Sequence, residues 1–385
     1  MPSAFLAYRH KGINRGNDFE RGATASQRFG KLLLSENAPI SALRAMRDSG
    51  EDHMPELWSK MSEAGWPGIV IPDAYSGLEF GYVGAGVVLE EMGRTLALSP
   101  FLSSAVVAAS LINQLGSEQQ KEKYLPGIAS GELTAVLAAD ETGFFDLDDI
   151  STSATSTDNG YTLSGNKRGV IDGHNADLLL VVTNGEEGMS VFAIEKDTAG
   201  VSCETRLIVD SQRAADISLE SVAVTKEALL GSLGDASSAL EFTIDVAAAC
   251  SAAEMLGISI ETFERTVGYL KEREQFGNKI GTFQGLQHRA AQLFAEIEVS
   301  KSAVLAALQA LDENSEKRSV LASMAKAKCA KVVRNATEEG VQMHGGIGMT
   351  DEFDIGFFMK RAAVCRQAYG DYHFHANRFA ELRGY

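Results

Sequence analysis

The sequence contains few cysteines and few prolines, and the glycines follow no repeating pattern. Its 385 residues include seven prolines and 37 glycines without a common period, which excludes a collagen-like or disordered chain. The four cysteines (Cys203, Cys250, Cys329 and Cys365) lie far apart, so no C-x-x-C pair is present. This spacing excludes a zinc finger or a dithiol motif and favours reduced thiols in a cytosolic protein.

Positive charge is scarce as well. The 35 Lys and Arg residues face 52 Asp and Glu residues, which gives a formal net charge of −17. General binders of nucleic acid or of anionic membranes need a basic surface, so this balance argues against both functions. The longest apolar runs, such as 178–182, are too short to span a bilayer, and the N-terminus lacks the residue order of a signal peptide. We therefore expect a soluble, cytoplasmic protein.

Helical patterns dominate the first third of the chain. Apolar residues return at spacings of three and four, and 83–98 is expected to form one of the longer helices. Ser117 and Gln120 fit a capping box, in which the serine oxygen accepts a backbone N–H at the start of a helix. Pro126-Gly127 is expected to end that helix. These patterns predict an N-terminal all-α domain over 1–132.

Between residues 133 and 235 apolar and polar residues alternate over short runs, which predicts β-strands. Asp158-Asn159-Gly160 separates two such runs, and Asn-Gly at that place favours a hairpin because both turn residues need a positive φ. No G-x-G-x-x-G follows any predicted strand, so the sequence does not support a Rossmann nucleotide site. The segment predicts a middle β domain with a barrel-like or sandwich-like architecture.

From residue 236 onward the helical period returns and runs longest. One expected helix carries an apolar seam typical of bundle packing, made of Leu286, Ala290, Leu293, Ile297, Val304, Leu308 and Leu311. The segments 239–270 and 320–341 are expected to be its neighbours, and the last forty residues to be less regular. The sequence thus predicts an α+β protein in which a C-terminal four-helix bundle over 236–385 follows the other two domains.

Several motifs together resemble the acyl-CoA dehydrogenase family over roughly residues 50 to 369. In the C-terminal region they are 273–281 with Phe283-Gln284, and 342–348 with Arg361 downstream. In the N-terminal region they are 90–93 and 116–121. The order of the three regions is also the order in that family. The combination is far more specific than any one of the motifs.

The resemblance implies an FAD-dependent oxidoreductase of fatty acid or lipid catabolism, which dehydrogenates an acyl-CoA thioester between its α and β carbons. In such an enzyme a carboxylate of raised pKa removes the α-proton, and the β-hydrogen leaves as hydride to flavin N5. The resemblance also implies a flavin electron acceptor such as an electron-transfer flavoprotein. A homo- or hetero-tetramer is expected, because the family's cofactor site is shared between chains.

The segment around residue 273 resembles the part of the family that meets the FAD of a neighbouring subunit. Arg273 would bind the pyrophosphate, because the fork of guanidinium donors suits two phosphate oxygens. Phe276 would pack against the adenosine half, although a lone aromatic side chain is more often part of a core. Gln275 and Gln284 are assigned to FAD on the same resemblance.

The segment Gln342-Met343-His344-Gly345-Gly346 resembles the other half of the dinucleotide site. Glycines there let backbone N–H groups approach a phosphate or adenine closely. His344 is given no catalytic role and fits a structural histidine equally well. His373-Phe374-His375 has a spacing that could hold a metal on a strand, but no further ligands cluster nearby. Solvated histidines are therefore favoured, and no metal site is predicted.

The sequence departs from the family at the expected base. Many members carry a glutamate that aligns with Gly370, which has no side chain and cannot accept a proton. Asp371 follows one residue later and is the candidate base. One residue along a helix rotates the side chain by about 100°, so Asp371 could serve only if the loop has a different conformation. Members that place the base on an earlier helix would have it at 247–248, which here is Ala-Ala. Asp245 lies nearby, and we interpret its charge as compensating a helix dipole.

The middle domain departs from the family too. The segment that hydrogen-bonds flavin in the family corresponds to 140–146, which begins with Asp140. The segment that flanks the flavin ring corresponds to Gly169-Val170-Ile171. An aspartate where a neutral hydroxyl usually sits would oppose negative charge on a reduced ring.

Four interpretations remain open at this point. The chain could form an active homo-oligomer with Asp371 as base, or it could complete the flavin site of a homologous partner that supplies the base. Losing the base lowers a rate by roughly 10²–10⁴, so a lone enzyme would be severely impaired, and we favour the partner arrangement. A flavin monooxygenase on the same fold is a third possibility. A non-enzymatic assembly or acyl-CoA-binding protein is the fourth.

Overall fold

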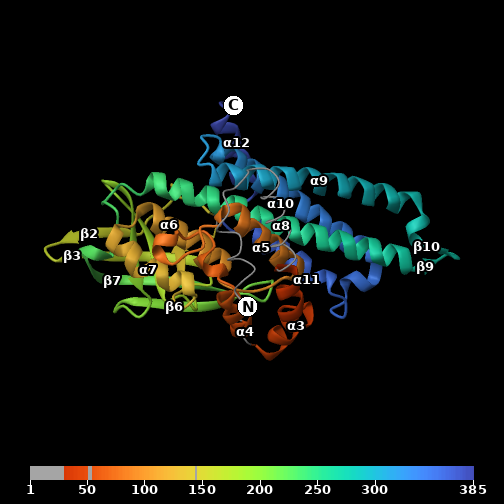
Figure 1. Ribbon diagram of the computed structural model, residues 1–385, viewed down its shortest axis with the longest axis horizontal. Helices are drawn as coiled ribbons and strands as arrows, with labels where there is room; N and C mark the ends of the chain where they lie inside the picture. Colours follow the sequence, from red (N-terminus) through yellow and green to blue (C-terminus); the bar gives the residue numbers. More distant parts are fainter. Residues whose placement is uncertain (1–29, 51–53, 144) are drawn as a thin grey trace. The chain divides into compact units, whose positions relative to one another are not determined.

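The computed structural model describes residues 30–50, 54–143 and 145–385. These residues divide into two compact units, each assembled from segments that are distant in the sequence. The first, which we call the helical unit, comprises the described residues 30–49, Gly86–Leu98 and Ala248–Tyr385. The second, the mixed unit, comprises Gly50–Ala85 and Ser99–Ala247. Figure 1 labels the larger helices and several strands of both units.

Long helices make up the helical unit. A helix over 30–37 precedes α3 (Ile40–Ser49). The main helices are α9 (Gln284–Asp312) and α10 (Arg318–His344), with the greater part of α5 (Gly81–Thr95) and of α8 (Ser237–Glu272), whose first residues belong to the mixed unit. Shorter elements are the hairpin of β9 (Glu274–Gln275) and β10 (Asn278–Lys279), η5 (Ile280–Thr282), η6 (Gly345–Met349), α11 (Ile355–Gln367) and α12 (Tyr372–Leu382).

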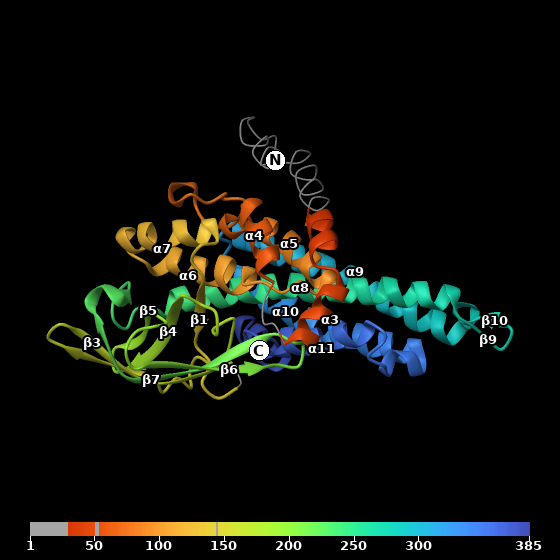
Figure 2. The ribbon, with the colours of Figure 1, turned by 90° about the horizontal axis from the view of Figure 1, so that it is seen from below.

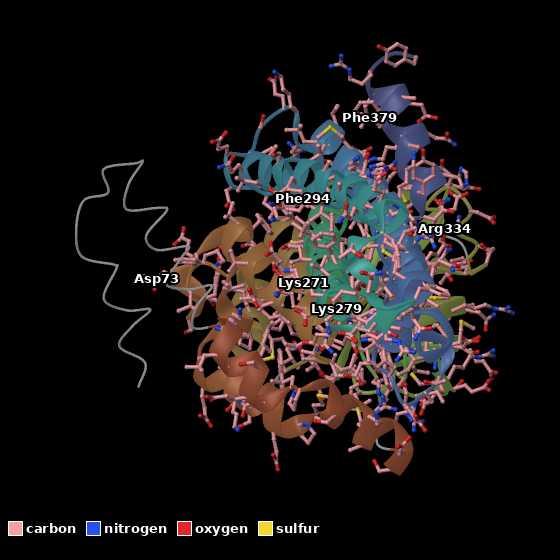
Figure 3. The ribbon with its side chains drawn as sticks, turned by 90° about the vertical axis from the view of Figure 1, so that its right-hand side faces the viewer. Asp73, Lys271, Lys279, Phe294, Arg334 and Phe379 are labelled. Atoms are coloured by element: carbon pink, nitrogen blue, oxygen red, sulfur yellow. The ribbon has the colours of Figure 1, made fainter. Side chains whose placement is uncertain are left out.

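The predicted seam of α9 is largely confirmed. Leu293, Ile297, Val304, Leu308 and Leu311 are buried, as the spacing predicted. The opposite side of the helix also carries apolar residues: Phe294 and Val299 are 51% and 57% exposed. Phe294 is labelled on α9 in Figure 3. The last forty residues are more regular than expected, because α11 and α12 lie there.

The mixed unit combines two sheets with short helices. The helical elements are α4 (Pro55–Glu63), η1 (Trp66–Gly68), η2 (Asp73–Tyr75), η3 (Phe101–Ala108), α6 (Ala109–Leu115), α7 (Glu118–Ser130) and η4 (Lys226–Ala228). The strands are β1 (Ala135–Ala138), β2 (Ser153–Thr157), β3 (Gly160–Ile171), β4 (Leu178–Gly185), β5 (Gly188–Glu195), β6 (Val201–Leu207), β7 (Arg213–Thr225) and β8 (Leu229–Leu230).

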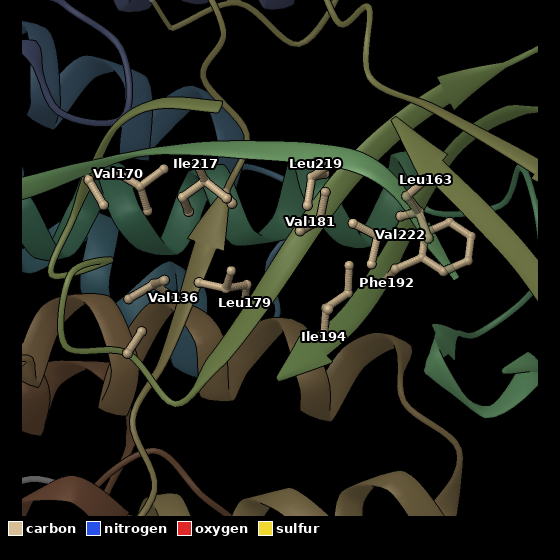
Figure 4. Close-up of a cluster of buried hydrophobic side chains, with 13 residues drawn as sticks. Val136, Leu163, Val170, Leu179, Val181, Phe192, Ile194, Ile217, Leu219 and Val222 are labelled. Atoms are coloured by element: carbon tan, nitrogen blue, oxygen red, sulfur yellow. The ribbon is translucent and has the colours of Figure 1, made fainter. Parts of the chain in front are cut away.

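Each sheet has four strands, in the orders β1-β4-β5-β8 and β2-β3-β7-β6. All neighbours are antiparallel except β1 and β4. One buried cluster joins the sheets: Leu179, Val181 and Phe192 come from the first, and Leu163 and Ile217 from the second (Figure 4). This packing confirms the predicted sandwich-like β domain.

Two local predictions need correction. The capping box of Ser117 and Gln120 is present, but α7 continues through Pro126 to Ser130 and ends at Gly131 in the left-handed region. The proline therefore does not end the helix, whereas the glycine with φ of 78° does. The hairpin is also present, but Thr157 pairs with Gly160, so Asp158 and Asn159 form its turn.

Helix α8 is the one described helix long and apolar enough to cross a membrane by length and composition. Its 18-residue window has a mean hydropathy of 1.4 and is 100% buried inside the protein, as in the core helix of a globular fold. Two glycines let it approach α5 at backbone distance. A Cβ on Gly257 would lie 1.9 Å from the carbonyl oxygen of Glu90, and one on Gly93 would lie 2.1 Å from that of Glu254.

We expect Gly257→Ala to lower the free energy of unfolding by about 1–3 kcal/mol, because the added methyl would push α8 away from α5. Gly268→Ala is the matched control, since it lies in the same helix and its Cβ would meet nothing within 4 Å. The control should be neutral or should stabilise by about 0.5–1 kcal/mol. Denaturant unfolding of both variants checks this, and equal values would contradict the close contact.

Candidate cofactor and base site

At the hairpin that follows α8, the aromatic ring of Phe276 and the guanidinium of Arg273 are both exposed. Its turn has Phe276 at a φ of 54° and Gly277 at 76°, the two positive values of a tight hairpin turn. Phe276 is 90% exposed and contacts only the edge of Phe283, at 6.3 Å between ring centroids. Lys271 and Lys279, labelled in Figure 3, lie on either side of the turn in sequence.

Arg273 has an exposed guanidinium with no hydrogen bond or ion pair among the described residues. Its backbone is fixed, because its N–H donates to Tyr269 and its carbonyl accepts from Ile280. The neighbouring charges on the hairpin are neutralised, since Lys279 pairs with Glu274 at 2.7 Å. Gln284 is exposed in the first turn of α9, and the side chain of Gln275 folds back onto the carbonyl of Glu274. A free cation beside an apolar ring suits an anionic aromatic ligand.

At the end of α10 the predicted segment divides into a buried and an open part. Met343 and His344 are buried, so their side chains are not available to a ligand from outside. Gln342, Gly345 and Gly346 are exposed, and a Cβ on either glycine would meet nothing within 4 Å. Gly345 has φ 66° and ψ −142°, a conformation essentially restricted to glycine. The open space above these glycines can admit another group.

His344 serves to anchor this segment. Its Nδ1 lies 2.7 Å from the carbonyl oxygen of Gly340, one turn earlier, and donates to it. The ring stacks on Tyr269 at 4.5 Å and lies 4.7 Å from Phe353. Burial lowers the pKa of His344, against the effect of the Gly340 bond, so the ring is neutral at physiological pH. The structural role considered from the sequence fits these contacts.

Helix α3 contacts the loop that follows the glycines (Figure 2). Arg47 pairs with Asp351 at 2.6 Å. Arg44 reaches both Asp351 and Asp354, at 3.1 and 3.0 Å. The rings of α11 add to this contact, since both guanidiniums lie about 5 Å from the centre of the Phe357 ring. This network could not be predicted from the sequence, because its partners are more than 300 residues apart.

The turn between α11 and α12, residues 368–371, is the place of the expected base. Gly370 has a φ of 97°, and a Cβ there would lie 2.5 Å from Cδ1 of Phe374 and 2.9 Å from Nε2 of His375. The carboxylate of Asp371 caps α12 and accepts the N–H of Phe374 at 2.8 Å. The sequence-based candidate is therefore already engaged in a helix cap.

The other candidates on α8 are placed differently from expectation. Asp245 is fully buried and lies in the third turn of α8, so a charge compensating the dipole at the helix start was the wrong interpretation. Glu254 is the buried carboxylate that sequence reasoning missed. Both Nε and Nη2 of Arg361 reach its Oε1, at 2.7 and 2.6 Å. This pair has no sequence signal, because the two residues are 107 positions apart.

The two terminal histidines also behave differently from each other. His373 is exposed, as expected of a solvated side chain. His375 is fully buried and contacts the carbonyl oxygen of Tyr369 at 2.9 Å, so the solvated interpretation was wrong for it. Both lie on α12 rather than on a strand. Among the described residues no cluster of three or more His, Cys, Asp or Glu could hold a metal ion.

In the mixed unit, neighbouring acidic residues after β1 have opposite environments. Glu141 accepts hydrogen bonds from Lys167 at 2.7 Å and from the backbone and hydroxyls of Ser151 and Thr152. Burial raises the pKa of Glu141, but these bonds outweigh it and bring the pKa to about 2. Asp140 has none of them, and its Oδ1 is buried without a hydrogen-bond partner in the described part of the chain. Burial raises the pKa of Asp140 to about 6, against the charge of Lys167.

The expected FAD can be tested against these features. In the helical unit, Arg273 has a guanidinium without a partner among the described residues, and the space over Gly345 and Gly346 is open, so both could receive a bound group. In the mixed unit, taken by itself, Oδ1 of Asp140 is buried without a hydrogen-bond partner among the described residues. Gly169, at the flank of the expected ring, has a φ of 63° and also meets nothing within 4 Å. The residues of the helical unit fit the phosphates of a dinucleotide, which Arg273 and the N–H groups of the two glycines would bind. Phe144 of the 140–146 segment lies outside the described residues.

We expect Asp140→Asn to stabilise the protein at pH 7 by about 1–2 kcal/mol, because a buried carboxylate without a donor is replaced by a neutral group. The pKa of Asp140 is higher in the folded than in the unfolded protein. The stability of the wild type therefore falls as pH rises from about 4 to 6, while the buried carboxyl loses its proton. Above pH 6 this loss of stability is complete and stays constant. The advantage of the variant should therefore grow as pH rises from about 4 to 6. Exposed Asp149→Asn is the control, and thermal unfolding at several pH values is the measurement. A constant difference between variant and wild type would contradict this account.

Comparisons with known proteins agree with the geometry. Three models match in order: "Acyl-CoA dehydrogenase, N-terminal domain" over 34–132, "middle domain" over 135–222 and "C-terminal domain" over 236–381. Isovaleryl-CoA dehydrogenase of Solanum tuberosum is 30% identical over 80% of this chain and 77% of its own.

Solved structures are similar over nearly the whole length. A variant of the Tcur3481-Tcur3483 steroid ACAD has a TM-score of 0.87 and 29% identity, covering 94% of this chain and 98% of that one. Butyryl-CoA dehydrogenase from Megasphaera elsdenii shares the fold, with a TM-score of 0.87 and 22% identity over 97% and 100%. Because all three domain models match in sequence order and cover most of the chain, this protein belongs to the acyl-CoA dehydrogenase family of flavin-dependent oxidoreductases.

Proposed function

We propose that the chain is one subunit of a hetero-oligomeric, FAD-dependent acyl-CoA dehydrogenase in which a homologous chain supplies the base for the α-proton. The observation that carries this proposal is the turn at 368–371. Gly370 has neither a side chain nor the space for one, and Asp371 is engaged in capping α12. Because the carboxylate of this turn is engaged in a helix cap, a chain of this family needs a base from elsewhere.

The exposed segments of the helical unit support a contribution to a shared site. Bound FAD would accept the β-hydrogen of an acyl-CoA as a hydride, which is the chemistry the cofactor supplies. Arg273 would hold the pyrophosphate with its guanidinium fork, and Gln284, Gln342 and the N–H groups of Gly345 and Gly346 would contact the rest of the dinucleotide. Phe276 would cover the adenosine and exclude water from it.

One similar solved structure bears on the substrate and on the assembly. It is named after two gene products and as a steroid ACAD. By analogy with that steroid enzyme we propose a bulky acyl-CoA as substrate. From the family and the sequence we further propose an electron-transfer flavoprotein as electron acceptor and the cytoplasm as the place of action. The homo-oligomeric alternative with Asp371 as base would require that side chain to leave the N–H of Phe374.

The flavin content of the chain purified alone is the decisive measurement, compared with that of the complex formed with a co-purifying homologue. We expect well below one FAD per lone chain and no bleaching by a panel of acyl-CoAs, but bound FAD and bleaching in the complex. In the complex, Arg273→Gln should weaken FAD binding by roughly 10- to 100-fold, because a charge-assisted bond to phosphate is lost.

Lys271→Gln is the matched control, since Lys271 is an exposed cation two residues away and should leave the FAD affinity unchanged. About one FAD per lone chain, bleached by an acyl-CoA, would contradict the partner arrangement. Bound flavin in the complex that no acyl-CoA reduces would point instead to the monooxygenase.

The turn itself can be tested by substitution. We expect Gly370→Ala to destabilise the chain by about 1–3 kcal/mol, because alanine at a φ of 97° is strained and its Cβ meets Phe374. Gly356→Ala in α11 is the control, since its Cβ would meet nothing within 4 Å. For the same reason Gly370→Glu should not give the lone chain dehydrogenase activity. Activity of that variant would show that the turn does accept a base.

A further inference from the structure

A fully buried lysine lies beneath the turn that lacks the base. Lys326 comes from α10, and its ammonium donates three hydrogen bonds. The acceptors are the hydroxyl of Ser251 at 2.9 Å, the carbonyl of Cys365 at 2.7 Å and the carbonyl of Ala368 at 2.8 Å. Lys326 forms no ion pair with a carboxylate in the part of the chain that the structure describes. An ammonium has three protons, so this set of acceptors uses all of them.

The position explains how an unpaired cation is tolerated there. Cys365 and Ala368 belong to the last turn and the C-cap of α11, where carbonyl groups lack partners within the helix and the helix dipole is negative. Burial lowers the pKa of Lys326 to about 8, against the opposing effects of Cys365, Glu254, Cys329 and Asp371. The side chain is therefore mainly an ammonium at neutral pH.

The side chain of His375 binds the next residue of the turn, Tyr369. Nε2 of His375 lies 2.9 Å from the carbonyl oxygen of Tyr369 and donates to it. Burial lowers the pKa of His375 to about 3, and the charge of Lys326 acts in the same direction, so the ring is neutral. Its other nitrogen faces Ser323 at 3.5 Å, and Arg378 donates to the same hydroxyl at 3.1 Å. Ser323 and Lys326 are three residues apart and share one face of α10.

Each residue of the turn is thus held in a different way. Lys326 holds Ala368, His375 holds Tyr369 in its left-handed conformation, and Asp371 is fixed by its cap of α12. Gly370 completes the turn with a backbone conformation that no other residue adopts easily. The two side chains that bind these carbonyl groups are linked to the same face of α10, because Lys326 lies on that face and His375 contacts Ser323 there.

We propose that Lys326 is the positioning residue of the 368–371 turn, holding the end of α11 through two carbonyl groups. The placement of the turn follows from the described contacts alone. Only its relation to the acyl group rests on the proposed function, in which the turn forms a wall of the substrate site. In that setting Lys326 acts through the turn, without touching substrate or cofactor.

The test is amide hydrogen exchange on the full-length chain with Lys326→Met, which keeps the length of the side chain and removes its protons. The reporters are the amides of Ala368, Phe374 and His375, which donate to Val364, to the Asp371 carboxylate and to the Asp371 carbonyl. We expect these amides to exchange at least tenfold faster, while the amides of α9 keep their protection. Lys331→Met is the matched control, because Lys331 is an exposed lysine of the same helix.

Two results would overturn the proposal: unchanged exchange at the turn, or an equal acceleration throughout the helical unit, which would mark a purely structural role. If Lys326→Met does not fold, Lys326→Gln keeps two protons and should give a smaller acceleration in the same three amides. Unchanged turn amides in Lys326→Gln would then overturn the proposal.

The complex provides a second readout. Lys326→Gln should lower the rate of flavin reduction by acyl-CoA several-fold while the FAD content stays that of the wild type. A wild-type complex that does not turn over acyl-CoA would overturn the proposed function. The role of Lys326 in placing the turn would still be decided by the hydrogen-exchange experiment. A normal rate of reduction in a variant whose turn exchanges faster would overturn the role of the turn in the substrate site.

Discussion

The backbone contact between α5 and α8 is the constraint on which the helical unit depends. Only glycine at positions 93 and 257 lets the two helices approach this closely. The position of α8 then determines where its other residues act. Ser251 meets Lys326, Glu254 meets Arg361, and Arg273 stands in the hairpin where the helix ends. A change in the separation of two helices would therefore reach the base turn and the cofactor segments together.

The site also illustrates how charge is managed in a chain with an excess of acid. Two buried lysines carry the local polar structure, and each has a different partner. Lys167 pairs with the carboxylate of Glu141 and also donates to the carbonyl of Ala139. Lys326 donates to two carbonyl groups and to the hydroxyl of Ser251, with no carboxylate partner among the described residues. An ion pair fixes a side chain, but a cation shared among carbonyls fixes the backbone. The second arrangement suits a turn whose central residue has no side chain to anchor it.

Much of the fold could be predicted from the sequence because its signals are local. The capping box at Ser117, the seam of α9 and the hairpin near Asn159 each lie within a short window. The prediction for Pro126 was wrong because the tertiary fold tolerates a proline inside α7, and α11 and α12 lack a clear period. In the site, the absence of a side chain at position 370 is visible in the sequence. The burial of Lys326 is not, because Lys328 and Lys331 stand beside it in the same helix and are not fully buried.

The conformation of Gly370 has a consequence for descent within the family. In a lineage that once had a glutamate at this position, its replacement by glycine allowed the ring of Phe374 and the imidazole of His375 to approach the backbone. A single reverse substitution now meets both side chains and an unfavourable φ. In such a lineage a carboxylate could return only after both neighbours had changed, which would make its loss difficult to reverse.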